Sequence, residues 1–266
     1  MAKRIYNKLF IQLGVDMRAV ILAAGRGSRM GNATDVKPKC LTVIGGKPLI
    51  DWQYQAITQA GITNITVVGG YRSETLRSDK YSLALNPDWE STNMAATLFC
   101  AGEYEGDTLV SYSDILYPAA HIRSLMSLKA DIAITADLLW RSLWEERFND
   151  PLKDAETFKS QDGILTEIGA KTNDINEIEA QYMGLLKFSK RGLKSAGEVF
   201  NGLSPEKRNK LDMTSLLRLL MAKNEKIKVA LVEGKWCEVD NQNDLNTYNS
   251  LIEKGNWIHD WRINEK

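Results

Sequence analysis

The chain has 266 residues, and its 34 Lys plus Arg balance its 34 Asp plus Glu, so the formal net charge is zero. This balance gives no global attraction to nucleic acid or to an anionic membrane, and no apolar run approaches the roughly 20 residues of a membrane span. Three widely spaced cysteines, Cys40, Cys100 and Cys237, and only two histidines argue against a disulfide framework, a zinc site and a Ser-His-Asp triad. We therefore expect a cytoplasmic protein whose chemistry rests on carboxylates, Lys, Arg and backbone amides.

Strands and helices are predicted to alternate through the first half of the chain. Residues 1–16 precede the first strand and are interpreted as an extension, since no cleavage site of a signal peptide follows their short apolar run. The alternation predicts an α/β fold with a doubly wound, mainly parallel, Rossmann-like sheet. Strands are predicted at 18–23, 41–44, 65–68, 83–85, 108–113 and 132–136, and helices at 48–60, 73–78, 94–102 and 118–129.

The pattern changes in the second half of the chain. Residues 140–180 are polar and charged, with hairpin-like pieces joined at Asp162-Gly163, and they predict an insertion that covers the open end of the sheet and the active site. We expect a single domain at 17–256 and a tail at 257–266, whose Trp257 and Trp261 either support a homodimer or pack on their own chain. Strands are predicted at 181–189, 227–232 and 235–239, and helices at 190–200, 212–224 and 241–254.

A Gly-rich turn, Ala24-Gly25-Arg26-Gly27-Ser28-Arg29-Met30-Gly31, follows the first strand. Ligands of open α/β sheets bind beyond the carboxyl ends of the strands, where glycines let backbone N–H groups approach phosphates. Arg29 adds donors suited to phosphate oxygens. The alternative is a dehydrogenase dinucleotide turn, but Met30 occupies the third glycine position and no acidic residue follows in the usual context. The turn therefore predicts nucleotide binding.

Two lysines bracket a proline shortly after this turn, in Lys37-Pro38-Lys39-Cys40-Leu41. Together with Leu22-Ala23-Ala24-Gly25-Arg26-Gly27-Ser28-Arg29-Met30, this segment resembles the signature of the nucleotidyltransferase family. Gly45-Gly46-Lys47-Pro48-Leu49-Ile50 and Val67-Val68-Gly69-Gly70-Tyr71 are similar to further family motifs. The resemblance covers about residues 17–255 and implies the nucleotidyltransferase fold, which is also GT-A-like.

The resemblance implies roles for individual residues of the nucleotide site. Arg29 and Lys39 would act on the reacting phosphates and are the predicted catalytic residues. Asn93 is a further nucleotide-site candidate, with a helix cap as its alternative role. The predicted nucleotide-binding residues are Leu22, Ala23, Ala24, Gly25, Gly27, Ser28, Arg29, Gly70 and Asn93.

Two aspartates are the predicted ligands of Mg²⁺, which prefers carboxylate and phosphate oxygens. Asp114 follows the strand predicted at 108–113, and Asp240 follows the strand predicted at 235–239. Both match the metal-binding aspartates of the family, although many members carry Gly where this chain has Ser113. A cap or turn residue is the alternative role of Asp114.

The segment from Asn86-Pro87 to Thr92-Asn93-Met94 resembles the phosphocholine and aminoethylphosphonate cytidylyltransferases more than the sugar enzymes. The implied reaction joins CMP from CTP to a phosphocholine, an aminoethylphosphonate or a phosphorylated amino acid derivative, as in the biosynthesis of cell-surface polysaccharides, and releases pyrophosphate. The predicted acceptor-binding residues are Glu179, Tyr182, Trp140 and Trp236, with Trp89 and Trp144 as further aromatic candidates.

The sequence leaves three alternatives to this reaction. A sugar-1-phosphate nucleotidyltransferase would use UTP, dTTP or GTP in the same chemistry. A metal-dependent glycosyltransferase would usually show Asp-x-Asp, whereas position 112 is Tyr. A non-catalytic nucleotide-binding regulator would be expected to lose Lys39, Asp114 or Asp240, and this chain keeps all three.

Overall fold

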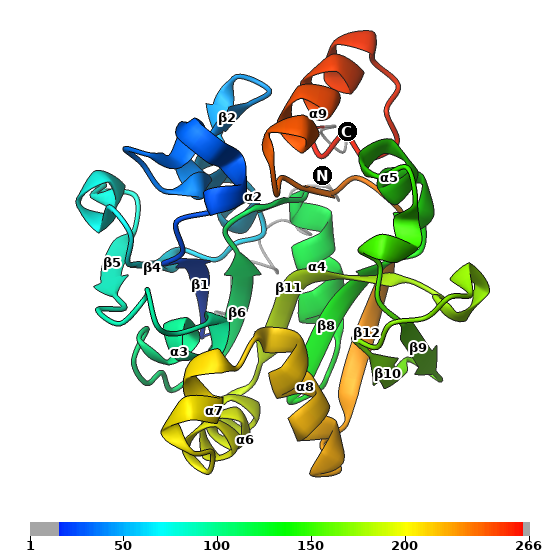
Figure 1. The fold of residues 1–266 in the computed structure, drawn as a ribbon. Coiled ribbons are helices and arrows are strands. Elements are labelled where there is room, and N and C mark those ends of the chain that lie inside the picture. The colour runs from blue at the N-terminus through cyan, green and yellow to red at the C-terminus, as the bar shows by residue number, and fades with distance from the viewer. Residues whose placement is uncertain (1–15, 263–266) are drawn as a thin grey trace, which may run out of the picture.

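The computed structural model describes residues 16–262, and nine strands of this part form one mixed sheet (Figure 1). The strands are β1 (Met17–Ala23), β4 (Asn64–Gly69), β5 (Ser82–Leu85), β6 (Asp107–Tyr112), β8 (Ile132–Asp137), β9 (Phe158–Gln161), β10 (Ile164–Ile168), β11 (Gln181–Phe188) and β12 (Ile227–Val232). Their order is β5-β4-β1-β6-β11-β8-β12-β10-β9. β11 runs antiparallel to both β6 and β8, while β5, β4, β1, β6, β8 and β12 share one direction.

The position of β1 explains where a ligand site can form. β1 is buried along its whole length and pairs in parallel with β4 on one side and β6 on the other. The chain therefore leaves the carboxyl end of β1 toward one half of the sheet and returns to the other half. Such a switch point opens a crevice beyond the strand ends, which is where ligands bind in open α/β sheets.

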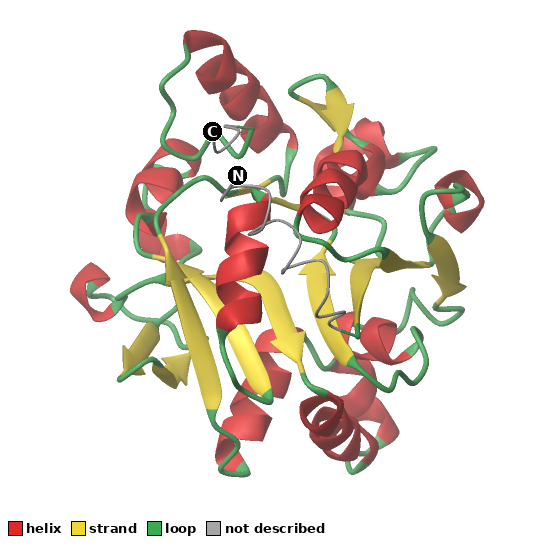
Figure 2. Cartoon of the chain, turned by 180° about the vertical axis from the view of Figure 1, so that it is seen from behind, coloured by secondary structure: helices red, strands yellow, loops and turns green. Residues whose placement is uncertain are grey.

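Helices cover both faces of the sheet, and α4 is seen lying across one face in Figure 2. Side chains along β1 alternate between two cores, with Ala19 and Ile21 in one and Val20 and Leu22 in the other. The first core includes buried residues of α2, α4, α5 and α9, and the second includes those of α3, α6 and α8. The helices are α2 (Leu49–Gln59), α3 (Met94–Phe99), α4 (Ala119–Ser127), α5 (Trp140–Arg147), α6 (Lys190–Asn201), α7 (Pro205–Lys210), α8 (Met213–Ala222) and α9 (Gln242–Lys254). The predicted α/β class is confirmed.

Some predicted elements differ from the structure. The strand predicted at 41–44 is only β2 (Val43–Ile44), which pairs with β3 (Lys47–Pro48) in a separate small sheet. The helices α5 and α7 were not predicted. The hairpin at Asp162-Gly163 is confirmed, since both residues have positive φ (52° and 72°), as a type I′ turn requires. β10 pairs with β12, so the hairpin extends the main sheet at its edge.

The two ends of the domain pack against it where the structure describes them. Trp257 stacks on Tyr248 with ring centroids 5.0 Å apart, and Trp261 meets Trp52 edge-on at 5.9 Å. Both tail tryptophans are buried in their own chain. The extension predicted at 1–16 lies outside the described residues except for Asp16, whose carbonyl accepts a hydrogen bond from Asp107 N. No helix within 16–262 is long and apolar enough to cross a membrane.

Candidate active site

The Gly-rich turn folds directly against Lys39. Gly27 adopts a left-handed conformation (φ 71°, ψ 49°) before the short 3-10 helix Ser28–Thr34. A Cβ atom on Gly27 would lie 2.7 Å from Lys39 Cβ, closer than real Cβ contacts allow. Glycine at position 27 is therefore needed both for the backbone conformation and for the approach of the Lys39 side chain.

Replacing Gly27 with Ala tests this contact. We expect Gly27→Ala to lower kcat/KM by about a hundredfold, because Lys39, a predicted catalytic residue, must shift by a large fraction of an ångström. Gly163→Ala is the matched control, since Gly163 also has a positive φ but its Cβ would meet open space. Both variants are compared by steady-state kinetics. Equal losses of kcat/KM in the two would contradict the assigned role of Gly27.

Lys39 lies between two aspartates that are far apart in sequence. Its Nζ is 2.7 Å from Asp114 Oδ2 and 3.1 Å from Asp240 Oδ1, and all three side chains are largely buried. Burial alone would lower the pKa of the Lys39 ammonium, but the carboxylates of Asp114, Asp240 and Glu238 outweigh it and raise the pKa. Arg29 also forms an ion pair with Asp240. The predicted catalytic residues and metal ligands thus form one charged cluster.

A short antiparallel ladder brings the two aspartates together. β7 (Ile115–Leu116) pairs with β13 (Cys237–Glu238), and Val239 N donates to the Asp114 carbonyl at 2.9 Å. Asp114 directly precedes β7, and Asp240 lies two residues after β13. Since the ladder joins backbone atoms next to both residues, it fixes the spacing of their carboxylates.

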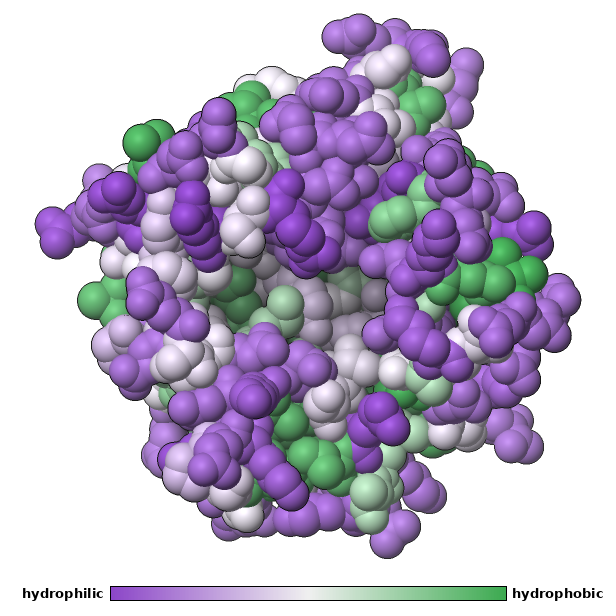
Figure 3. All heavy atoms as spheres, in the orientation of Figure 1, coloured by the Kyte–Doolittle hydropathy of each residue, from purple (hydrophilic) through white to green (hydrophobic). Residues whose placement is uncertain are grey.

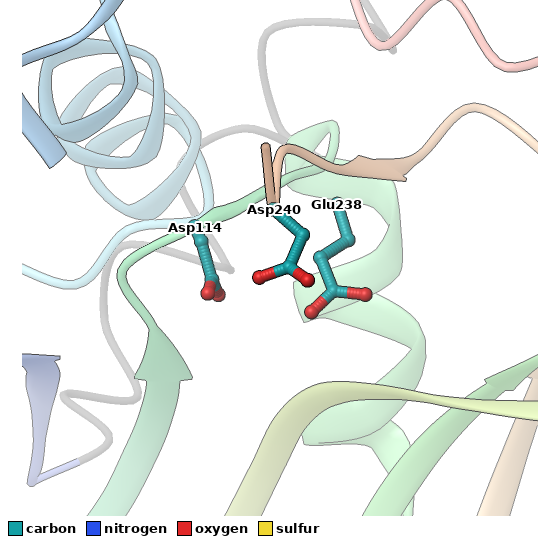
Figure 4. Close-up of side chains that lie close together, drawn as sticks. All are labelled: Asp114, Glu238 and Asp240. Atoms are coloured by element: carbon teal, nitrogen blue, oxygen red, sulfur yellow. The ribbon is translucent and has the colours of Figure 1, made fainter. Parts of the chain in front are cut away.

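Glu238 is a third carboxylate at this point, and it was not predicted from the sequence. Carboxylate atoms of Asp114, Glu238 and Asp240 lie within 4.8 Å of one another, and the three side chains point toward a common space in Figure 4. Burial, together with the Asp114 and Asp240 carboxylates, raises the pKa of Glu238 to about 7, although Arg147 opposes the shift. The i, i+2 spacing of Glu238 and Asp240 in an extended segment was the signal that could have found it.

A buried arginine forms ion pairs with Glu238 of this cluster and with the neighbouring Asp244. Arg147 of α5 lies 3.3 Å from Glu238 Oε2 and 3.2 Å from Asp244 Oδ2, with only 1% of its side chain exposed. Asp244 in turn accepts a hydrogen bond from Asp240 N at 2.8 Å and forms a capping box with Asn241 at the start of α9. Burial alone would lower the pKa of Arg147, but Glu238, Tyr248 and Asp244 raise it. Arg147 therefore keeps its charge and fixes two acidic residues.

The donor set of this cluster fits Mg²⁺. The potential ligand atoms of this cluster are all carboxylate oxygens, which suit a hard divalent cation. The cluster contains no His or Cys. In addition, Asp114 Oδ1 is buried and has no hydrogen-bond partner, so a lone pair is available on the side of the cluster that Lys39 does not use. Asp114, Asp240 and Glu238 are the residues that would hold the ion.

A cavity of about 200 Å³ joins the Gly-rich turn to this cluster. Most of the predicted nucleotide-binding residues line it, but Ala23 is buried in the core, and Ser28 and Gly70 do not reach the cavity wall. Asn93 lines the cavity and also caps α3, since its Oδ1 accepts from Met94 N at 2.8 Å. The cavity is lined by Leu22, Ala24, Gly25, Gly27, Arg29, Lys39, Trp89, Thr92, Asn93, Met94, Thr97, Tyr112, Ser113 and Asp114.

A second cavity of about 260 Å³ shares Arg29 and Tyr112 with the first. Asp114 lines the first cavity, and Glu238 and Asp240 line the second, so the two cavities meet at the acidic cluster. Figure 3 shows the hollow at the centre of this face. Of the predicted acceptor-binding residues, Tyr182 lines this cavity. Trp140 and Trp236 are buried in the core. Glu179 is exposed and does not line the cavity, and its carboxylate accepts a hydrogen bond from Ser160 N. The lining also includes Trp144, Asp154, Glu156, Thr157, Phe158, Ile168, Gln181, Thr214, Glu238 and Asp240.

Comparisons with known proteins agree with this geometry. Residues 19–148 match the family described as the MobA-like NTP transferase domain. The CTP:phosphoglutamine cytidylyltransferase of Campylobacter jejuni is 38% identical over 247 residues, which cover 86% of this chain and 98% of that protein. The choline-phosphate cytidylyltransferase of Streptococcus pneumoniae is 32% identical over 102 residues, or 37% of this chain and 44% of that protein. A solved inositol-1-phosphate CTP transferase from T. maritima superposes with a TM-score of 0.71 at 19% identity, covering 88% of this chain and 93% of that one, which is a likeness of fold.

Proposed function

The chain belongs to the nucleotidyltransferase family with the MobA-like NTP transferase domain, and on this premise we propose that it transfers CMP from CTP to a phosphorylated amino acid derivative, with Mg²⁺ as cofactor and release of pyrophosphate. The similarity to a CTP:phosphoglutamine cytidylyltransferase over 98% of that protein supports both the nucleotide and the acceptor class. The observation that carries the proposal is that two cavities, one at the phosphate turn and one lined by Tyr182, meet at the cluster of Lys39, Asp114 and Asp240.

This arrangement suits an attack of one anion on another. A phosphate monoester is largely dianionic at neutral pH, so its oxygen is already a nucleophile and no general base is needed. The acceptor oxygen attacks the α-phosphorus in line, the bond to the β-phosphate oxygen breaks, and pyrophosphate leaves with the electron pair. A site without histidine is therefore sufficient for this reaction.

The protein must mainly hold the two anions together and stabilise the charge of the transition state. Arg29 lines both cavities, so its guanidinium can contact oxygens of the acceptor and of the nucleotide. Lys39 presents a fully charged ammonium to the reacting phosphates from within the nucleotide cavity. Mg²⁺ bound by the three carboxylates would supply further positive charge at the phosphate oxygens. The turn at Gly25 and Gly27 orients the triphosphate through backbone N–H groups.

Pyrophosphate release tests this function. The enzyme is incubated with Mg²⁺ and each of the four NTPs, against phosphoglutamine, phosphocholine, 2-aminoethylphosphonate and several sugar 1-phosphates. We expect release with CTP and phosphoglutamine, loss of this release when EDTA removes the metal, and recovery when Mg²⁺ is added back. Release only with a sugar 1-phosphate and UTP, dTTP or GTP would replace the proposal by the sugar-1-phosphate alternative.

A further inference from the structure

The acceptor cavity has a second acidic wall, apart from the catalytic carboxylates. Asp154 and Glu156 lie in the segment before β9, flank the buried Ala155, and both line the cavity. Neither carboxylate forms an ion pair within 4 Å with any cation in the described part of the chain. Lys171 is nearby, but its Nζ donates to the backbone carbonyl oxygens of Asp154 (2.8 Å) and Ala155 (3.4 Å). Two partly buried carboxylates thus line the cavity, and neither has an ion-pair partner within the described residues.

The surrounding structure holds these two carboxylates in place. Trp144 Nε1 donates to Asp154 Oδ2 at 3.0 Å, which fixes that carboxylate and leaves its other oxygen for the cavity. Gln181 Nε2 donates to the Glu156 carbonyl at 2.6 Å and fixes its backbone. Gly169 has a positive φ (81°), and a Cβ atom there would lie 2.4 Å from Thr214 Cγ2 and 3.6 Å from Glu156 Oε2. Glycine at position 169 therefore allows Thr214 and Glu156 to pack closely against this part of the cavity wall.

Burial and like charge at this wall favour a positive group beside the two carboxylates. Burial raises the pKa of Glu156, and the charges of Asp212 and Asp154 raise it further, whereas Lys171 and Arg218 only partly offset them. Two like charges at a partly buried wall are unfavourable until a positive group lies between them or beside them. In addition, Trp144 and Tyr182 line the same cavity, and aromatic rings attract ammonium groups. Each of these groups gains from a ligand with N–H donors and positive charge.

We propose that Glu156 and Asp154 bind an ammonium group of the acceptor and thereby select acceptors that are cationic at the end away from the phosphate. The inference rests on the proposed function, because it concerns the acceptor cavity of that reaction. Arg29 at the catalytic end binds the anionic group, and the carboxylate pair binds the cationic group. A neutral hydroxyl would satisfy the hydrogen bonds of these carboxylates but would leave their charges uncompensated. The cavity is therefore complementary to a zwitterionic acceptor, such as an amino acid derivative with a free α-amino group.

The test compares two acceptors of similar size that differ in this charge, phosphoglutamine and its analogue with a hydroxyl in place of the α-amino group. Binding of each compound to the full-length enzyme is measured by calorimetry, and kcat and KM are measured with CTP. We expect the wild-type enzyme to prefer the free amine by at least about tenfold in both Kd and kcat/KM. Glu156→Gln should remove most of this preference by raising the Kd and KM of the free amine, while the KM for CTP is unchanged. Asp154→Asn should act in the same direction, since its amide oxygen still accepts from Trp144.

Glu145→Gln is the matched control, because it removes the same charge from the exposed, outer side of α5. It should preserve the preference for the free amine. Equal binding of the two acceptors by the wild-type enzyme, or a Glu156→Gln variant that weakens both equally, would overturn the inference while leaving cytidylyl transfer intact. A preference for the free amine that depends on Glu156, found together with turnover of a different NTP, would support the inference and reject the CTP assignment instead.

Discussion

Asp114→Asn is expected to lower kcat on the order of a thousandfold while the protein still folds. Asp114 Oδ2 holds Lys39 Nζ at 2.7 Å, and its other oxygen is the buried, unpartnered atom that we assign to the metal. An asparagine keeps the shape of the side chain but removes its negative charge, so the ion pair and the affinity for Mg²⁺ are both lost. The backbone bond from Val239 N to the Asp114 carbonyl remains, so the β7–β13 ladder should persist.

The measurement is steady-state pyrophosphate release, with thermal unfolding followed in parallel. Asp51→Asn is the control, because Asp51 lies on α2 in a partly exposed ion pair with Lys80, outside the lining of both cavities. It should leave kcat unchanged. Activity of the Asp114→Asn enzyme within about threefold of wild type would contradict the metal assignment. A threefold change corresponds to less than about 1 kcal/mol in the activation free energy.

Arg147→Met should have the largest effect on stability, with a loss of about 3–5 kcal/mol in the free energy of unfolding. The change leaves the carboxylates of Glu238 and Asp244 buried without their cation. Activity should fall as well, because Asp244 positions the backbone of Asp240 through the hydrogen bond from Asp240 N. A methionine of similar length keeps the packing of the side chain, so the loss reports mainly the missing charge.

Denaturant unfolding measures this loss, and Arg141→Met on the same helix provides the comparison. Arg141 is exposed and pairs with Glu145 one turn along α5, an interaction worth only about 0.5 kcal/mol. If Arg147→Met were no more destabilising than Arg141→Met, the network of Arg147, Glu238 and Asp244 would not support the site as described.

The arrangement of the candidate nucleotide site was predictable from the sequence where it depends on local patterns. A buried strand followed by Gly25 and Gly27 indicates a phosphate turn wherever the strand lies in the sheet. Asp114 likewise follows a clear apolar strand, and parallel strands present their carboxyl ends at one edge. The Asp162-Gly163 turn was predicted from its dipeptide alone, and its positive φ angles confirm it.

The contacts that hold the acidic cluster, and the walls of the second cavity, were not predictable in the same way. Arg147 meets Asp244 and Glu238 across 97 and 91 residues, through the packing of α5 against α9, and no local pattern specifies such contacts. The helix α5 itself did leave a signal, since Trp140, Leu143, Trp144 and Arg147 are its buried residues at i, i+3, i+4 and i+7. The polar residues between these positions made the helical pattern hard to recognise in the sequence. Of the two tryptophans of α5 that were acceptor-site candidates, Trp140 is buried in the core and Trp144 lines the cavity.

Attack of an acceptor oxygen on the α-phosphorus of CTP would determine which phosphorus compounds form. Phosphorus-31 NMR of the enzyme with CTP, Mg²⁺ and phosphoglutamine identifies them, because the products of the competing reactions have different resonances. We expect pyrophosphate and a new product in which CMP is joined to the acceptor phosphate, in equal amounts. Formation of CDP, or of free CMP with the acceptor unchanged, would contradict transfer of CMP to the acceptor.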